Sequence, residues 1–323
     1  MRTVMVTGVG AIIGYGVLRS LRQSGTKVRL VGVDASPTAV GAAWCDQFIP
    51  APFTSSDDYA EWLDRALAQS GAELLIPCIE QDVAYLAAHV QDVSKKTRLA
   101  LNRPDLIRIA TDKGLMDDEL RRIDSPARIE TRFEGSFASL AQAFGVPFLV
   151  KPRRSYASKG LVKINSPSAF APLESRLGAE LMAQPIIGDD DAEYTVGVFG
   201  DGRGTVLASI TLRRLLAKDG STAAAWQETD ATLDSVVAGL CAHFAPLGPT
   251  NLQFRKNSTG WKLLEINPRI SSSTSIRAAL GFNDAVMCVD YYLDGKSIEQ
   301  PALKPGHVKR YIEDLVFYDR ADL

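Results

Sequence analysis

The segment Lys262-Leu263-Leu264-Glu265-Ile266-Asn267-Pro268-Arg269 decides the fold and the function predicted for this chain. In a strand, successive side chains point to opposite faces, so Glu265 and Asn267 project from one face while their apolar neighbours pack on the other. A carboxylate beside an amide oxygen is a hard ligand pair that suits Mg²⁺ carrying nucleotide phosphates. A solvated strand edge is the alternative, but it does not explain the Pro-Arg pair and the three serines that follow. The pattern therefore favours a metal and phosphate site.

A partner strand precedes this segment. Residues 251–267 predict a hairpin that turns at Asn257-Ser258-Thr259-Gly260. If the two strands pair without a bulge, residues of matching parity share a face. Gln253 then joins Glu265 and Asn267 as a third oxygen ligand.

The rest of the C-terminal third also predicts antiparallel strands. Residues 193–199 and 205–212 are strand-like runs joined by a glycine-rich turn at 200–204. Between the two hairpins, residues 230–244 have helical periodicity with an apolar stripe on one face.

The first hundred residues alternate short apolar runs with helical patterns. Strands are expected at 3–7, 28–33 and 73–77, and helices at 12–23, 57–69 and 82–90. This alternation predicts a parallel sheet with right-handed crossovers, as in an α/β domain. Further along the chain, the apolar run 146–152 predicts a strand that ends on a cation, Lys151.

Composition excludes several classes of protein. With 323 residues, of which 46% are hydrophobic and 23% charged, the chain can bury a sizeable core and is not disordered. Lys and Arg total 36 against 38 Asp and Glu, so no overall charge bias favours nucleic acid or an anionic membrane surface. The four cysteines lie far apart, which argues against a zinc site and a disulfide framework. No apolar run is long enough for a membrane span, and we expect a cytoplasmic protein.

A glycine-rich turn, Gly8-Val9-Gly10-Ala11-Ile12-Ile13-Gly14, lies where the first strand leads into a helix. Backbone amides at such a turn can face an anion, and Asp34 ends the next strand, where dinucleotide-binding domains carry a ribose-binding acid. The spacing is Gly-x-Gly-x-x-x-Gly rather than Gly-x-Gly-x-x-Gly, and a turn of this kind also serves to pack a helix against a strand. An NAD(P)-dependent oxidoreductase built on this turn is therefore an alternative function.

The segment 265–269 resembles the Glu-x-Asn-x-Arg motif of the ATP-grasp superfamily, most closely its carbamoyl-phosphate-synthetase-like branch, which also holds carboxylate-amine ligases. In that family the motif binds metal and phosphate. Upstream, Lys113 resembles the first nucleotide-binding cation of the family, and Lys151 resembles the second, which contacts phosphate and adenine. Each lysine alone is more often a surface charge, but their order and spacing before Glu265 favour the match.

Residues 181–188 followed by 193–196 resemble the hinge that holds adenine in this family. The resemblance implies that Gln184 faces the adenine amino group, that Ile186 supplies backbone contacts and that Glu193 binds the ribose hydroxyls. Pro185 cannot donate an amide hydrogen bond, which departs from the family pattern. The loop 153–160 occupies the place of the mobile phosphate lid, although it holds one glycine only.

The resemblance spans roughly residues 112–295 and implies an α/β fold in three parts. An N-terminal Rossmann-like, pre-ATP-grasp domain with a parallel sheet (1–108) precedes a two-lobed α+β ATP-grasp module. That module divides into a small lobe or lid (109–186) and a large lobe with the antiparallel sheet and the metal site (187–323). In such proteins the N-terminal domain usually helps to bind the second substrate. Glu80, just after the third predicted strand, is a candidate substrate residue, with an acidic helix N-terminus as the alternative.

The activity that the resemblance implies is ADP-forming ligation: a carboxylate is activated as an acyl phosphate, which an amine then attacks. Arg269 and Lys151 are the candidate catalytic residues, with Arg269 stabilising the developing acyl-phosphate charge. Arg213, Arg214 and Lys218, expected on a loop after the strand 205–212, are candidates for holding the substrate carboxylate. A plain solvated basic loop is the alternative for these three residues.

The cofactors implied are ATP and Mg²⁺, with Mn²⁺ as a substitute for magnesium. The partners are small-molecule carboxylate and amine substrates, without nucleic acid or membrane, and homodimers are common among proteins of this kind. A non-catalytic nucleotide-binding protein is a further alternative to the ligase.

Overall fold

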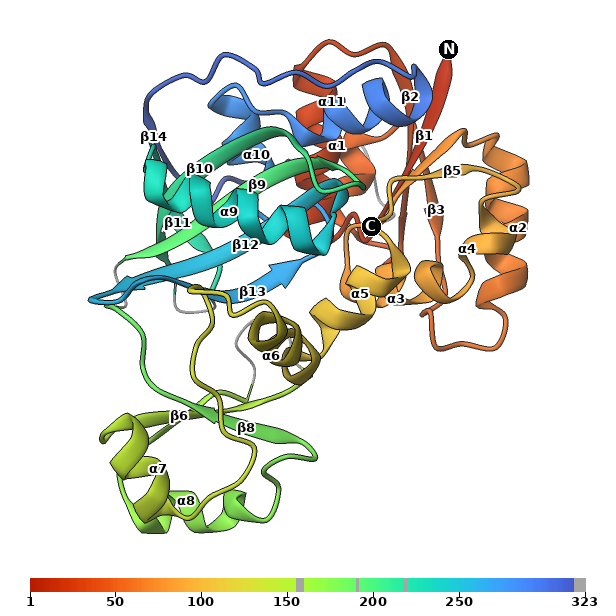
Figure 1. Cartoon of the computed structure of the whole chain (residues 1–323). Helices are drawn as coiled ribbons and strands as arrows, with labels where there is room; N and C mark the ends of the chain where they lie inside the picture. The colour runs from red at the N-terminus through yellow and green to blue at the C-terminus, as the bar shows by residue number, and fades with distance from the viewer. Residues whose placement is uncertain (155–159, 190–191, 218–219, 317–323) are drawn as a thin grey trace.

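The computed structural model describes residues 1–154, 160–189, 192–217 and 220–316 (Figure 1). Their strands form three sheets, of five, six and three strands. The five-stranded and six-stranded sheets lie side by side, and the three-stranded sheet stands apart below them with its two helices (Figure 1). The predicted fold class, an N-terminal parallel sheet followed by antiparallel sheets in a mixed α/β chain, is confirmed.

The N-terminal sheet is parallel throughout, with the strand order β3-β2-β1-β4-β5. β3 and β5 were not predicted because strands of four and two residues leave no hydrophobic periodicity. The elements of this region are β1 (Arg2–Thr7), α1 (Ile12–Gln23), β2 (Val28–Asp34), the 3₁₀ helix η1 (Val40–Trp44), β3 (Gln47–Pro50), α2 (Tyr59–Ser70), β4 (Leu74–Ile76), α3 (Glu80–Ala88), α4 (Val90–Val93) and β5 (Arg98–Leu99).

The six-stranded sheet is antiparallel, in the order β13-β12-β9-β10-β11-β14. Its strands are β9 (Glu193–Asp201), β10 (Val206–Leu216), β11 (Thr222–Glu228), β12 (Leu247–Asn257), β13 (Gly260–Asn267) and β14 (His307–Lys309). The predicted helix between the hairpins is α9 (Ala231–Phe244), and Asp230 caps it by accepting hydrogen bonds from two amides of its first turn. One face of the sheet packs on α9 through buried residues such as Phe254 and Leu240.

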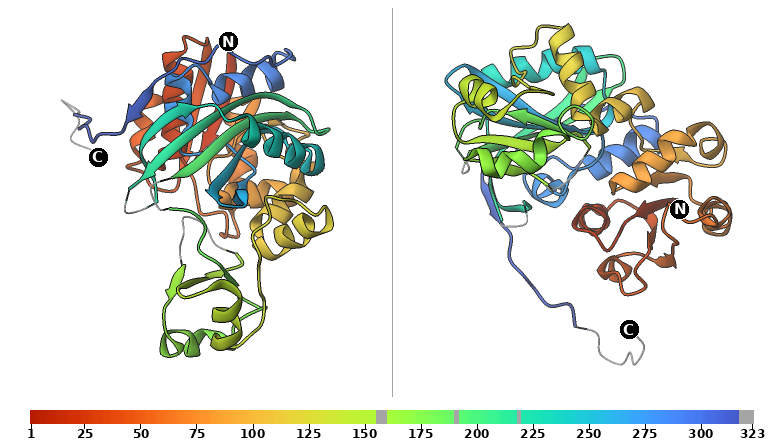
Figure 2. Two further views of the ribbon diagram at one scale, coloured as in Figure 1. Left: turned by 60° about the vertical axis from the view of Figure 1, so that its left-hand side comes forward. Right: turned by 90° about the horizontal axis from the view of Figure 1, so that it is seen from below.

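The three-stranded sheet consists of β6 (Phe148–Pro152), β7 (Val162–Ile164) and β8 (Leu181–Gln184), with β6 in the centre. Two helices, α7 (Phe137–Phe144) and α8 (Pro167–Glu174), cover it and enclose a small core of its own around Phe148 and Phe170. The left view of Figure 2 shows this lobe projecting from the rest of the molecule.

Two further helices, α5 (Pro104–Thr111) and α6 (Lys113–Arg122), follow the N-terminal sheet. Met116 and Leu120 of α6 pack into the core of the six-stranded sheet, although the predicted small lobe begins at residue 109. The predicted domain limits, 1–108, 109–186 and 187–323, stay predictions.

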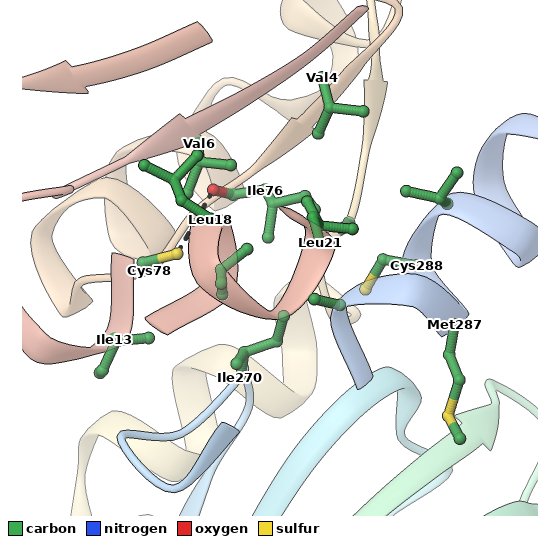
Figure 3. Close-up of a cluster of buried hydrophobic side chains, with 14 of the residues drawn as sticks. Val4, Val6, Ile13, Leu18, Leu21, Ile76, Cys78, Ile270, Met287 and Cys288 are labelled. Carbon is green, nitrogen blue, oxygen red and sulfur yellow. Dashed lines mark hydrogen bonds between the residues drawn. The ribbon is translucent and has the colours of Figure 1, made fainter. Parts of the chain in front are cut away.

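The C-terminal helices connect the N-terminal sheet to the six-stranded sheet. They are α10 (Thr274–Ala279), α11 (Asp284–Cys288) and the π-helix η2 (Val289–Leu293). Leu18 and Leu21 of α1 share one buried core with Ile270 and Met287 (Figure 3). The chain that leaves β13 is thereby held against the N-terminal domain, which places the residues after Asn267 between the two sheets.

Candidate active site

A bulge in the β12–β13 hairpin sets the register of the predicted metal ligands. The turn pairs Asn257 with Gly260, and this register continued along the strands would place Gln253 opposite Leu264. A register shift after Gln253 instead places it opposite Glu265. The expectation of a hairpin without a bulge is therefore wrong. The bulge is what brings Gln253 onto the face that carries the acid.

The same register continues across three strands. Asn251 lies opposite Asn267 on one side and Gly197 on the other, and Gln253 lies between Glu265 and Thr195. Directly opposite residues of antiparallel strands share a face. We call this side of the sheet the polar face: Glu193, Thr195, Asn251, Gln253, Glu265 and Asn267.

The side chains of the Glu-x-Asn-x-Arg motif contact one another. Asn267 donates from Nδ2 to Glu265 Oε1 at 2.9 Å, and its Oδ1 accepts from Arg269 Nη2 at 3.5 Å. Arg269 donates to the carbonyl of Ile270 at 2.9 Å. Its guanidinium also forms an ion pair with Glu80, in the first turn of α3. The structure thus brings the candidate substrate residue Glu80 to the candidate catalytic arginine, across 189 residues of sequence.

The two predicted lysines lie near Glu265. Lys113 begins α6 and Lys151 lies in β6. Burial lowers the pKa of Lys113, opposed by the negative charges of Glu265 and then Asp112. Burial lowers the pKa of Lys151 to about 8, with a further contribution from the positive charge of Lys113 and opposition from Glu265. Two desolvated cations that share one nearby carboxylate form an environment that favours an additional anion.

Asp112 and Gly114 hold Lys113 in place. Asp112 caps α6 by accepting from the Gly114 amide at 2.8 Å, and it also accepts from Arg153 Nε at 3.1 Å. A Cβ on Gly114 would lie 2.7 Å from Arg153. The start of α6 is therefore tied to the end of β6, so that the strand and the helix that carry the two lysines are fixed relative to each other. Residues 155–159 of the predicted lid loop lie outside the described residues.

The predicted adenine hinge, residues 181–188 and 193–196, includes β8 and the start of β9. Gln184 is buried and donates from Nε2 to Thr131 Oγ1 at 2.8 Å, and Ile186 is half-buried just beyond the strand. Glu193 begins β9 with its carboxylate bound by two arginines: one oxygen pairs with Arg214 and the other accepts from Arg255 at 3.3 Å. A ribose hydroxyl at Glu193 would have to share the carboxylate with these two cations.

The predicted basic loop is wrong in its placement. β10 continues to Leu216 and pairs with β11, so Arg213 and Arg214 lie within a strand and on opposite faces of the sheet. Arg213 forms an ion pair with Glu228 at 2.6 Å and lies over the ring of Trp226, and Arg214 is buried against Glu193. Both guanidinium groups are already paired with carboxylates of the protein. Lys218, the third candidate, lies outside the described residues.

The glycines of the N-terminal turn are explained by packing. A Cβ on Gly14 would lie 2.2 Å from the carbonyl oxygen of Gly8, and one on Gly8, where φ is +62°, would lie 2.7 Å from Ile79. Asp34 accepts hydrogen bonds from the amides of Gly10 at 2.7 Å and Ser36 at 2.8 Å. The turn borders a cavity of about 470 Å³ at the carboxyl ends of β1 and β2. The spacing therefore reflects close contact of α1 with β1, which was the alternative interpretation of the turn.

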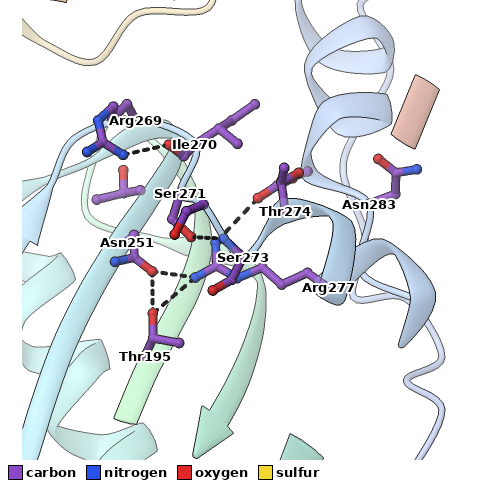
Figure 4. Close-up of polar contacts among 12 residues, drawn as sticks. Thr195, Asn251, Arg269, Ile270, Ser271, Ser273, Thr274, Arg277 and Asn283 are labelled. Carbon is purple, nitrogen blue, oxygen red and sulfur yellow. Dashed lines mark hydrogen bonds and ion pairs between the residues drawn. The ribbon is translucent and has the colours of Figure 1, made fainter. Parts of the chain in front are cut away.

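Three residues of the site have no counterpart among the predictions: Thr195, Asn251 and Arg277. The first two lie on the polar face beside Gln253, and Arg277 reaches them from α10 (Figure 4). Asn251 lies two residues before Gln253 on the same strand, so the two side chains point to the same face, and a known register would have predicted Asn251 as a site residue. No sequence motif includes Arg277.

The donor set fits a magnesium nucleotide. Gln253, Glu265 and Asn267 offer one carboxylate and two amide oxygens on a single face, the ligand chemistry that hard divalent cations prefer. Lys113 and Lys151 supply positive charge next to that set, where phosphate groups would lie.

Comparisons with known proteins agree with the fold. One part of the chain matches an ATP-grasp family model, as the motif predicts. Residues 179–315 match the family model described as "ATP-grasp in the biosynthetic pathway with Ter operon". No curated protein matches the chain.

Several solved structures share the fold over nearly the whole chain. N5-carboxyaminoimidazole synthetase from Staphylococcus aureus is 16% identical with a TM-score of 0.71, covering 94% of this chain and 80% of that one. Biotin carboxylase from Campylobacter jejuni is 15% identical with a TM-score of 0.70, covering 95% and 74%. L-amino acid ligase from Bacillus licheniformis is 12% identical with a TM-score of 0.69, covering 94% and 75%.

Within the described residues, no helix has the length and apolar character needed to cross a membrane.

Proposed function

We propose that this chain is an ADP-forming ligase that activates a carboxylate as an acyl phosphate and joins it to an amine. The observation that carries the proposal is the placement of Lys113 and Lys151 near Glu265, the residue of the polar face that begins the motif ending at Arg269. These groups come from three separate elements, α6, β6 and β13. An ion pair that only stabilises the fold needs just one cation and one carboxylate.

The reaction transfers one phosphoryl group and then displaces it. A carboxylate oxygen of the substrate attacks the γ-phosphorus of ATP, and ADP leaves with the electron pair of the broken bond. The amine then attacks the acyl carbon, phosphate leaves, and the amine loses a proton. The products are the amide, ADP and phosphate.

Each residue of the site has a role in positioning or in charge neutralisation. Mg²⁺ bound with ATP neutralises charge on the phosphates during transfer. Gln253, Glu265 and Asn267 would hold this ion, and Lys113 and Lys151 would hold the phosphates.

The remaining side chains of the site bind the nucleoside and the reacting carboxylate. Gln184, Ile186 and Glu193 would border the adenosine. Arg269, oriented by its ion pair with Glu80, would stabilise the negative charge on the acyl phosphate.

The proteins with the same fold support this choice of ligands. The synthetase from Staphylococcus aureus was solved with ADP, the biotin carboxylase from Campylobacter jejuni as a beta-gamma-ATP complex, and a biotin carboxylase domain from Hydrogenobacter thermophilus with MgADP and bicarbonate. The last of these is a dimer. We also propose that Mn²⁺ can substitute for Mg²⁺, that the chain forms a homodimer and that it works in the cytoplasm.

The test is phosphate release from Mg-ATP across a panel of carboxylates crossed with amines, including amino acids and uronic acids, with product identification by mass. A carboxylate and amine pair that yields an amide, one ADP and one phosphate supports the proposal. Tight NAD(P) binding without ATP binding would instead favour the oxidoreductase. ATP binding without consumption across the whole panel would favour a nucleotide-binding protein that is not an enzyme.

A further inference from the structure

The guanidinium of Arg277 reaches the polar face from α10 and is 1% exposed. Its Nη2 donates to Asn251 Oδ1 and, at 3.3 Å, to Thr195 Oγ1 (Figure 4). Its Nη1 pairs with Asp284 Oδ2 at 3.4 Å, and Asp284 also accepts from Thr274 at 2.5 Å. The charge of Arg277 is thereby balanced by Asp284, so its contacts on the polar face act through hydrogen bonds rather than through a free positive charge.

The sheet is shaped to admit this guanidinium. Gly197 is the neighbour of Asn251 on β9, and a Cβ there would lie 2.5 Å from Arg277 Cζ. The backbone of Gly197 has no positive φ, so the glycine is explained by the close approach of Arg277 and not by the conformation of the strand.

The contact fixes the orientation of the Asn251 carboxamide. Arginine only donates hydrogen bonds, so the amide oxygen of Asn251 must face Arg277 and the nitrogen must face away. Figure 4 shows the nitrogen of Asn251 turned away from Arg277. Among the described residues no protein acceptor contacts that nitrogen, and Asn251 lies opposite Asn267, a predicted metal ligand.

We propose that Arg277 is a positioning residue: through Asn251 and Thr195 it holds the donor end of the Asn251 carboxamide toward the oxygens of the bound Mg-nucleotide. Without Arg277 the carboxamide is free to flip, which would present an oxygen to an anion. This inference rests on the proposed function and adds to it a residue from outside every recognised motif.

The test measures binding rather than turnover. The probe is the non-hydrolysable analogue AMP-PNP, titrated by calorimetry with Mg²⁺ and with EDTA. A lysine lacks the planar guanidinium that contacts Asp284 and Asn251 at the same time. We therefore expect Arg277→Lys to lower the Mg²⁺-dependent affinity roughly tenfold. Asn251→Ala should cause a similar loss, and the double variant should lose no more than either single variant, because both act on one contact.

Three further variants separate positioning from general destabilisation. Gly197→Ala displaces the guanidinium without removing a hydrogen-bonding group, so it should weaken AMP-PNP binding as well. Gly239→Ala in α9, where a Cβ would meet nothing within 4 Å, is the matched control. Arg128→Lys removes a structural arginine that pairs with Asp117, and it should lower stability without changing the affinity.

The outcomes are distinguishable from those of the function itself. If the wild-type protein does not bind AMP-PNP, the proposed function fails. If it binds but Arg277→Lys and Gly197→Ala leave the Mg²⁺-dependent affinity unchanged, the positioning role of Arg277 is wrong. Additive losses in the double variant would also contradict it, because they would mean that Arg277 does not act through Asn251. Should Arg277→Lys fail to fold, Gly197→Ala and Asn251→Ala still decide the matter.

Discussion

The two faces of the six-stranded sheet are built from alternate residues of the same strands, yet they have different roles. On β12, Leu252 and Phe254 pack against α9 in a continuous apolar core. Asn251 and Gln253, which alternate with these two residues along the strand, carry polar groups on the opposite face. The apolar face follows the usual alternation for a sheet covered on one side. Three of the six residues of the polar face are buried, and their side chains form hydrogen bonds or ion pairs, while the other three are half-buried. Burial of polar groups is costly unless such contacts compensate it, and we infer that the polar face is maintained for a ligand.

The largest effect is expected on the polar face. Glu265→Ala combined with Asn267→Ala removes two of the three proposed magnesium ligands, so turnover of Mg-ATP should fall by at least about a thousandfold. The melting temperature should change little, because these residues do not belong to the apolar core. Steady-state ADP release measures the loss, and Lys262→Ala on the same strand serves as the control. ADP release at the wild-type rate would contradict the assignment.

The opposite result is expected on the apolar face. Phe254 is fully buried, and Phe254→Ala should lower the free energy of unfolding by about 3–5 kcal/mol through lost burial and a cavity. AMP-PNP affinity at a temperature where the variant is folded should stay within about twofold of wild type. Urea unfolding and calorimetry give the two quantities. A stability loss below about 1 kcal/mol would show that this face is not the core that we describe.

Lys151 connects the polar face to the small lobe, and its titration provides a pH test. Burial lowers the pKa of Lys151 to about 8 in the folded protein. Between that value and the ordinary lysine pKa of about 10.4, the unfolded chain binds more protons than the folded one, so stability rises with pH in this window, by up to about 1.4 kcal/mol per unit.

Lys151→Met removes the titrating group, so its stability between pH 8 and 10 should rise less steeply than that of wild type. Urea unfolding at several pH values measures both slopes. Lys163→Met, on the neighbouring strand β7 where the lysine side chain is exposed, is the control and should keep the wild-type slope. Identical slopes for wild type and Lys151→Met would contradict the desolvated environment of Lys151.

The smallest effect is expected at Arg213, which the sequence marked as a substrate residue. Its ion pair with Glu228 and its contact with Trp226 are partly exposed, so Arg213→Ala should cost at most about 1 kcal/mol of stability. The KM for the carboxylate, once identified, should not change. A rise of tenfold or more in that KM would restore Arg213 to the substrate site.

The sequence predicted the alternation of strands and helices and the motif residues, because both depend on local patterns. It did not predict the bulge after Gln253, because a bulge depends on how two strands twist and pair. The turn at Asn257–Gly260, taken alone, indicates a register in which Gln253 and Glu265 lie on opposite faces. Gln253 and Glu265 do share a face, but they do so because of the bulge and not because the hairpin pairs regularly.

Long-range pairing was the other limit of prediction. The contact of Glu80 with Arg269 and that of Arg277 with Asn251 and Thr195 join segments far apart in the chain. Arg213 and Arg214 were assigned to a loop because the basic pair interrupts the apolar pattern of β10, yet carboxylates on neighbouring strands compensate both charges. The position of these two arginines within a strand therefore depends on tertiary ion pairs, which the local polarity of the sequence does not reveal.

One measurement tests the central claim most directly: calorimetric titration of the wild-type protein and of the Glu265→Ala, Asn267→Ala double variant with AMP-PNP, with Mg²⁺ and with EDTA. NAD⁺ is titrated in parallel. We predict that the wild-type protein binds AMP-PNP, that Mg²⁺ strengthens this binding, that the double variant loses the magnesium effect, and that NAD⁺ does not bind. Equal magnesium-dependent affinity in both proteins, or binding of NAD⁺ in place of the ATP analogue, would contradict the claim that the polar face is a magnesium-nucleotide site.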